Sequence, residues 1–325
     1  MDNTFALKLK ALFQKLHLDC KRDEVWPRAV LSREEANDAI INLLTSDSPC
    51  MIARYGANEL AATVNYLGVK ENNHSYWGYA RGTSLAWWWY DSVRYSLSNN
   101  AGFFPATDEQ LCRFGQLMLD DSKYVDLLGT SQKDESYMVD YLSADVKYIR
   151  LSNFEPFWNK EPWTKTLKDK KVLVVYPLAE TILRQYEKRH HLFENQDILP
   201  DFRSLNVIKA VQSLGGSNSE YNTWFDALYK MEEQIEEIDF DVCLIGCGAY
   251  GFPLAAFVKR LGKKAIHMGG AVQLLFGITG GRWDKPIIED GLILDFNQLI
   301  NDYWVRPELA ERPNNHHKVE NSCYW

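Results

Sequence analysis

Three glycines at the spacing G-x-G-x-x-G, Gly246, Gly248 and Gly251, are the residues of this sequence that most clearly suggest chemistry. An apolar run at 242–245 precedes them, and apolar residues at helical spacing follow from 252, so they lie between a strand and a helix. At such a junction, backbone N–H groups without helical partners and the helix dipole favour an anion, commonly a phosphate. The spacing therefore predicts a site for a phosphate-bearing ligand, with tight-turn packing alone as the alternative.

A second glycine turn follows the next predicted strand. Residues 263–268 form that strand, and the pair Gly269-Gly270 comes directly after it. Successive parallel strands end at the same edge of a sheet, which is where open α/β proteins bind ligands. Farther on, Arg282 could clamp a phosphate while Trp283 stacks on a base, or the two could belong to a rigid loop with a packed indole. The ligand-binding residues expected in this half are Gly246, Gly248, Tyr250, Gly251, His267, Gly269, Gly270, Arg282 and Trp283.

The glycine spacing is also typical of dinucleotide-dependent oxidoreductases, so this class of protein must be considered. The dinucleotide fingerprint requires an acidic residue roughly 20 residues farther on to hold the ribose hydroxyls. Here that region reads His267-Met268-Gly269, and the next carboxylate along the chain is Asp284. The full fingerprint is absent, so this class is kept only as an alternative.

Charged side chains occupy another strand-to-helix junction. Arg54 ends an apolar segment that begins at residue 50, and Glu59 lies in the first turn of a helix expected from Ala57. Arginine binds phosphate oxygens through a planar fork, and a glutamate at this place can hold a cation or accept the proton of a hydroxyl. The alternative is an Arg–Glu pair that stabilises the turn.

The segment Arg54-Tyr55-Gly56 with Glu59, the run 244–254, and the turns around 267–270 and 281–283 together resemble the GT-D-type glycosyltransferases of bacterial surface-polysaccharide synthesis. The resemblance covers roughly residues 45–285. It implies a Rossmann-like fold, a nucleotide-sugar donor, commonly a UDP-sugar, and a saccharide or lipid-linked saccharide acceptor. It further implies catalytic roles for Glu59 and Arg54, and donor-binding roles for Gly56 and Asn58.

One position departs from that family's pattern. The family has Asp-x-Glu where this chain has Ala57-Asn58-Glu59. The resemblance implies Mn²⁺ or Mg²⁺, but one carboxylate makes a poor divalent-cation site unless a ligand diphosphate supplies the other oxygens. Either Glu59 works alone, with Arg54 and Arg282 stabilising the leaving diphosphate, or the chain is a divergent relative with altered chemistry. A non-catalytic module that binds a nucleotide-sugar or a partner is a further alternative.

The elements that position these residues alternate between short apolar runs and helix-length segments. This rhythm predicts a Rossmann-like α/β fold with a largely parallel sheet flanked by helices, and one of the helices is expected at 80–97. We expect a helical lead-in at 1–46, an α/β domain at 47–305 with any internal boundary near 150–170, and an irregular tail at 306–325. Within the tail, His316 and His317 are adjacent rather than four residues apart, which favours a surface segment over a metal site.

Composition limits the classes of function. The net charge of −8 argues against a nucleic-acid partner, because binding to phosphate backbones needs a basic surface. Six cysteines without a C-x-x-C pair indicate neither a disulfide framework nor a zinc cluster. No signal-like start and no apolar run near the roughly 20 residues of a membrane span is present. A cytoplasmic protein is expected, at the inner face of the membrane if the acceptor is lipid-linked, and a homo-oligomer is left open.

Overall fold

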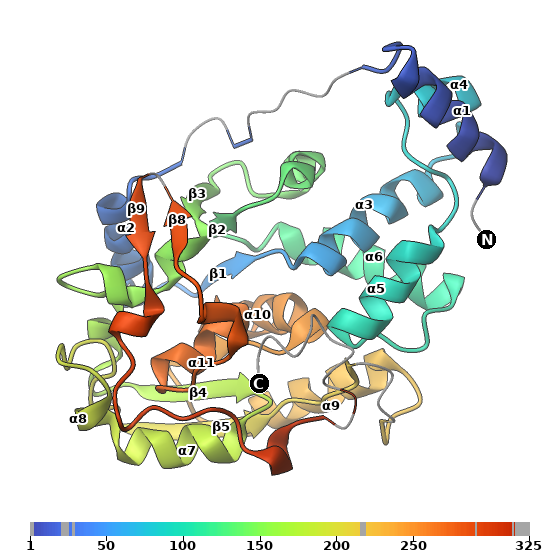
Figure 1. Cartoon of the computed structure of the whole chain (residues 1–325). Helices are drawn as coiled ribbons and strands as arrows, with labels where there is room; N and C mark the ends of the chain where they lie inside the picture. Colours follow the sequence, from blue (N-terminus) through green and yellow to red (C-terminus); the bar gives the residue numbers. More distant parts are fainter. Residues whose placement is uncertain are drawn as a thin grey trace.

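The computed structural model describes residues 3–20, 26–27, 30–214, 219–289, 291–313 and 315. A seven-stranded sheet with the order β3-β2-β1-β7-β6-β4-β5 forms its centre, and every pairing in this sheet is parallel (Figure 1). The strands are β1 (Cys50–Arg54), β2 (Leu127–Thr130), β3 (Lys147–Arg150), β4 (Lys171–Tyr176), β5 (Ser204–Lys209), β6 (Val242–Ile245) and β7 (Lys264–His267). The predicted parallel α/β architecture is confirmed.

The strand order brings distant parts of the chain together at one edge of the sheet. β1 leads outward to β2 and β3 on one side, whereas β6 leads inward to β7, so β7 lies directly beside β1. The carboxyl ends of β1, β7, β6 and β4 therefore lie next to one another. A crevice at this place is the usual ligand site of open α/β sheets.

Helices cover both faces of the sheet, because alternate strand residues face opposite sides. Met51 and Ala53 face one apolar cluster, and Cys50 and Ile52 face the other. The first face carries α3 (Ala57–Lys70), α5 (Asp91–Ala101), α6 (Asp108–Ser122), α9 (Trp224–Glu236) and α10 (Gly251–Arg260). The second carries α2 (Arg33–Thr45), α7 (Ala179–Glu187), α8 (Arg189–Leu192) and α11 (Val272–Leu275).

The segment near 150–170 does not divide the sheet. It forms three short 3₁₀ turns, Leu151–Phe154, Pro156–Trp158 and Trp163–Leu167. Phe154 and Trp163 from this segment are buried in the second apolar cluster together with residues of β1, β4 and β6. Strands from before and after the segment thus share one sheet and one core.

The lead-in separates into two parts. α1 (Thr4–Lys15) packs on α4 (Tyr76–Arg81), whereas α2 packs on the sheet beside β1 and β3, so the two helices lie at opposite sides of the molecule (Figure 1). The single helix predicted at 80–97 is wrong. Gly82, with φ +82°, ends α4 in a left-handed turn, and the next helix begins only at Asp91.

The C-terminal part is irregular, as predicted, but a portion of it is tied to the domain. Glu311, only 4% exposed, accepts hydrogen bonds from the backbone N–H groups of Glu180 (3.0 Å) and Thr181 (3.2 Å) at the start of α7. An antiparallel hairpin, β8 (Ile287–Glu289) and β9 (Leu292–Leu294), precedes this segment. His316 and His317 lie outside the described residues. Within the described part of the chain, no helix has the length and apolar character needed to cross a membrane.

Candidate functional site

A cavity of about 160 Å³ opens at the carboxyl ends of β1, β4, β6 and β7. Most of the residues singled out from the sequence line it: Arg54, Gly56, Asn58, Glu59, Gly246, Gly248, Tyr250, His267, Gly269, Gly270 and Arg282. Two do not. Gly251 lies behind the cavity against the ring of His267, and Trp283 is 4% exposed within the second apolar cluster. Arg282, by contrast, is exposed and reaches the cavity.

The glycine turns after β6 and β7 touch each other through their backbones. A Cβ on Gly246 would lie 2.1 Å from the carbonyl oxygen of Gly269, so this close approach requires glycine. Gly248 has φ +57°, and a Cβ there would meet the carbonyl oxygen of Ala101 at 2.9 Å. α10 begins directly afterwards, so the positive end of its dipole lies at this edge, although the N–H of Gly251 already donates to the carbonyl oxygen of Gly248. Both turns thus expose backbone suited to a phosphate.

Arg54 places a cation beside these turns. It is the last residue of β1, and its Nη1 lies 3.0 Å from where a Cβ of Gly269 would be. Its Nε is buried and has no hydrogen-bond partner among the described residues. A buried donor left unpaired costs roughly 1–3 kcal/mol, so a ligand oxygen that accepted from it would relieve that cost.

His267 ends the neighbouring strand β7 and stays neutral. It is 4% exposed, and its pKa is lowered to about 3 because burial removes water and because the charge of Arg54 is close. Its Nδ1 is also buried without a hydrogen-bond partner in the described part of the chain. The imidazole can therefore orient a polar ligand group but adds no positive charge to the cavity.

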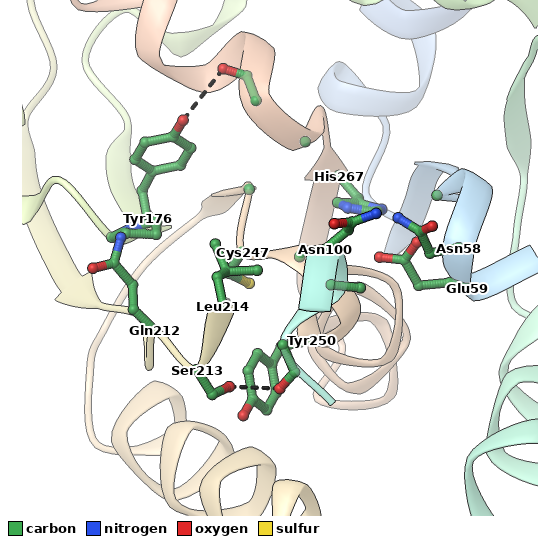
Figure 2. A pocket seen from close by; sticks show the side chains of 18 of the residues that line it. Asn58, Glu59, Asn100, Tyr176, Gln212, Ser213, Leu214, Cys247, Tyr250 and His267 are labelled. Atoms are coloured by element: carbon green, nitrogen blue, oxygen red, sulfur yellow. Dashed lines mark hydrogen bonds between the residues drawn. The ribbon is translucent and has the colours of Figure 1, made fainter. Parts of the chain in front are cut away.

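Glu59 is the third residue of α3 and turns back toward the start of its own helix. A Cβ on Gly56 would lie 1.9 Å from its Oε2, so the carboxylate covers that glycine, and Glu59 is only 7% exposed. Figure 2 shows the side chains of Asn58 and Glu59 pointing from α3 toward those of Asn100 and His267. A carboxylate here is favoured by the helix dipole, so Glu59 stabilises the turn and faces the cavity at once.

The residues of the cavity do not fit a divalent cation. Glu59 is the only carboxylate among the described residues that line it. No group of three or more His, Cys, Asp or Glu side chains within the described ranges is arranged to hold a metal ion. Mg²⁺ and Mn²⁺ take mainly carboxylate, carbonyl and water oxygens, whereas the charged neighbours of Glu59 here are two arginines, Arg54 and Arg282.

A wall that the sequence did not predict closes the other side of the cavity. Its side chains are uncharged, and Figure 2 shows Tyr176, Gln212 and Ser213 across from Asn58 and Glu59. The Tyr176 hydroxyl donates to Gln273 Oε1 (2.7 Å), and Ser213 Oγ donates to the carbonyl oxygen of Gly102 (2.5 Å). The lining residues that the sequence did not predict include Asn100, which lies beside Asn58 and His267, and Ala101, Gly102, Tyr176, Pro177, Leu178, Val211, Gln212, Ser213, Leu214, Cys247 and Gln273.

Position at a strand end could have identified part of this wall. Tyr176 is the last residue of β4, and Val211 to Leu214 follow β5 on the same edge of the sheet. Asn100 lies at the C-terminal end of α5 rather than after a strand, so its position in the sequence did not indicate a place in the cavity. It reaches the cavity only because α5 packs against the turn that contains Gly248.

Two further lining residues have mainly structural roles. Burial raises the pKa of the Cys247 thiol, and the nearby Glu59 raises it further, so the thiol is neutral and a poor nucleophile at neutral pH. Tyr250 is 1% exposed and stacks on Trp224 with ring centroids 4.9 Å apart. These two residues shape the base of the cavity.

Comparisons with known proteins found no matching protein-family model, no matching curated protein and no matching solved structure.

Proposed function

We propose that the protein is a glycosyltransferase that uses a nucleotide-sugar donor, with a UDP-sugar as the first candidate. The observation that carries the proposal is the buried, unpaired Nε of Arg54 beside the touching turns of Gly246 and Gly269. A cation and backbone turns at the carboxyl edge of a parallel sheet suit a diphosphate. The resemblance to GT-D-type enzymes supplies the reaction class.

The uncharged wall would then hold the uncharged parts of the donor. Gln212 offers an amide group, and Tyr176 offers an aromatic ring, on the side of the cavity opposite Asn58. Nucleobases and sugars are recognised by such hydrogen-bonding and aromatic groups. On this proposal, the diphosphate would lie between Arg54 and Arg282.

In the proposed reaction, a hydroxyl oxygen of a saccharide acceptor forms a bond to the anomeric carbon of the donor sugar. The bond from that carbon to the diphosphate oxygen breaks, and the nucleoside diphosphate leaves with the bonding electrons. Glu59 accepts the hydroxyl proton, while Arg54 and Arg282 stabilise the charge that develops on the leaving diphosphate. Electrostatic stabilisation of this kind is usually the largest contribution to catalysis. Because the cavity residues do not fit a metal ion, no step is assigned to one.

Thermal unfolding tests ligand binding. The protein is heated with UDP-, GDP-, CMP- and dTDP-sugars and with NAD(H), each with and without manganese. A ligand at about 100 times its Kd stabilises the fold by about 2.7 kcal/mol, which raises Tm by a few degrees. A shift with one nucleotide-sugar series supports the proposal, whereas a shift with NAD(H) alone would replace it with the oxidoreductase.

Two variants assign roles within the cavity. Arg54→Gln is expected to weaken nucleotide-sugar binding about 10- to 100-fold, as loss of a charged hydrogen bond does. Arg184→Gln, on the exposed side of α7, is the matched control and should bind as the wild type does. Glu59→Gln is expected to lower the rate of nucleotide release on the order of 100-fold with little change in Kd.

These variants also separate the transferase from a binding module. Full transfer activity in Glu59→Gln would eliminate the catalytic role of the carboxylate. Wild-type protein that binds a nucleotide-sugar but releases no nucleotide with any saccharide acceptor would favour the non-catalytic module. The alanine at position 57, where the resembled family has aspartate, also favours that module.

A further inference from the structure

The first helix, α1, carries two apolar stripes, and the structure covers only one of them. Ala6 and Phe13 are buried, and the ring of Phe13 packs edge-on against that of Trp77 with centroids 4.8 Å apart. The second stripe is Phe5, Leu9 and Leu12 of the same helix and Leu16 at its C-cap, with the spacing i, i+4, i+7 and i+11. This spacing places the four side chains on one face. Phe5, Leu12 and Leu16 are 64%, 49% and 54% exposed.

Aromatic residues of α4 extend this exposed stripe. Tyr76 lies edge-on against Phe5 with ring centroids 5.3 Å apart, and both Tyr76 and Trp77 are exposed. Leu18, just beyond the end of α1, is exposed as well. We call these neighbouring side chains the α1–α4 surface: Phe5, Leu12, Leu16, Leu18, Tyr76 and Trp77. In Figure 1 the two helices project together from one end of the molecule.

The charge of α1 identifies the kind of partner. The helix has lysines at 8, 10 and 15 and no acidic residue, although the whole chain has a net charge of −8. Lys8 and Lys15 are exposed beside the apolar stripe, whereas Lys10 lies over the ring of Tyr79, 4.7 Å from its centroid. Lysines that flank an apolar stripe, with tryptophan and tyrosine nearby, are typical of helices that lie in the interface of an anionic membrane.

We propose that the α1–α4 surface docks on an anionic lipid bilayer. α1 lies in the plane of the interface, Phe5, Leu12 and Leu16 enter the boundary between headgroups and acyl chains, and Lys8 and Lys15 pair with lipid phosphates. A single short helix gives reversible binding, and screening by salt weakens it. Docking of this kind is independent of what the cavity binds.

Vesicle flotation of the full chain tests the proposal. Vesicles of phosphatidylcholine alone are compared with vesicles that contain about 30% phosphatidylglycerol, at low and high salt. The wild type should float with the anionic vesicles at low salt and much less at high salt. Lys8→Gln/Lys15→Gln should lower partitioning about 25-fold, since each lysine near an anionic surface contributes about fivefold. Leu12→Asp/Leu16→Asp should lower it at least 10-fold, through loss of apolar burial.

The matched control is Ile288→Asp/Ile293→Asp on the β8–β9 hairpin. These isoleucines are 77% and 67% exposed, so the control adds the same charge at apolar positions that are more accessible than Leu12 and Leu16 and lie far from α1. It should bind vesicles as the wild type does, and circular dichroism checks that all variants fold.

Three results would overturn the proposal: no preference of the wild type for anionic vesicles, unchanged binding by Leu12→Asp/Leu16→Asp, or equal loss in the hairpin control. The oligomeric state, measured by size-exclusion chromatography with light scattering, could give a fourth result that overturns the proposal. If the wild type is a dimer that ignores vesicles and Leu12→Asp/Leu16→Asp makes it a monomer, a second copy of the chain covers this surface instead.

Discussion

A partly buried cluster of charges between three helices is expected to make the stability of the protein depend on pH. Asp121 of α6 is 1% exposed and pairs with Arg260 of α10, with Oδ1 and Nη1 2.5 Å apart. Glu232 of α9 is half-buried beside the same arginine. Burial raises the pKa of Glu232 to about 7 and that of Asp121 to about 6, and Arg260 only partly offsets this. One cation thus serves two carboxylates.

The sign of the effect follows from the raised pKa of Glu232. In the unfolded chain the pKa is near its ordinary value of 4.5, so the folded protein holds this proton more tightly. The resulting stability is fully present below about pH 4.5 and is lost as pH rises through 7. At about 1.4 kcal/mol per pKa unit the loss could reach about 3 kcal/mol, and solvent screening of a half-buried group reduces it to about 1–2 kcal/mol.

Glu232→Gln removes this ionisation. We expect the variant to be about 1–2 kcal/mol more stable than the wild type at pH 8 and equally stable at pH 4, as measured by urea denaturation. The control is Glu233→Gln on the same helix, where the exposed carboxylate pairs with Lys230 at 3.0 Å. Its free energy of unfolding at pH 8 should fall by no more than about 0.5 kcal/mol, whereas that of Glu232→Gln should rise. The reasoning would be refuted if Glu232→Gln did not increase the free energy of unfolding at pH 8, or if the increase were equally large at pH 4.

Two further substitutions test the packing of the site and of the lead-in. Gly246→Ala puts a Cβ 2.1 Å from the carbonyl oxygen of Gly269. It should therefore lower the free energy of unfolding by about 1–3 kcal/mol, measured by thermal unfolding, and weaken nucleotide-sugar binding. Wild-type stability and binding would show that the two turns separate easily. Ser32→Ala removes the capping box that Ser32 and Glu35 form at the start of α2. The free energy of unfolding, measured by urea denaturation, should fall by about 1 kcal/mol. An unchanged value would mean that packing on the sheet alone fixes this helix end.

The charged half of the site could be predicted from the sequence because its residues sit where local patterns end. Arg54 and His267 are the last residues of strands β1 and β7, and the turns at Gly246 and Gly269 directly follow the runs predicted at 242–245 and 263–268. In a parallel sheet all these ends meet at one edge, so identifying the strands was enough to group the residues.

The uncharged half depends on contacts between segments that no local pattern links. Ser213 reaches the cavity in a stretch fixed by its hydrogen bond to Gly102, 111 residues away in the chain. The adjacent residues Arg282 and Trp283 show the same limit in a different way. The sequence suggested a ligand contact for both, whereas the fold buries the indole in the core and leaves the guanidinium at the cavity.

The balance of charge in the cavity gives the departure at Ala57 a physical meaning. Arg54 and Arg282 face a single carboxylate, Glu59, and His267 is neutral, so the described lining residues carry a net charge of +1. An aspartate at 57 would bring this sum to zero, and a diphosphate would then need a cation to offset its charge. On the proposed function, alanine at 57 would leave the two arginines to act on the diphosphate directly. On the proposed function, the absence of a carboxylate at position 57 and the unpaired Nε of Arg54 would be two parts of one arrangement, in which fixed guanidinium groups take the place of a metal ion.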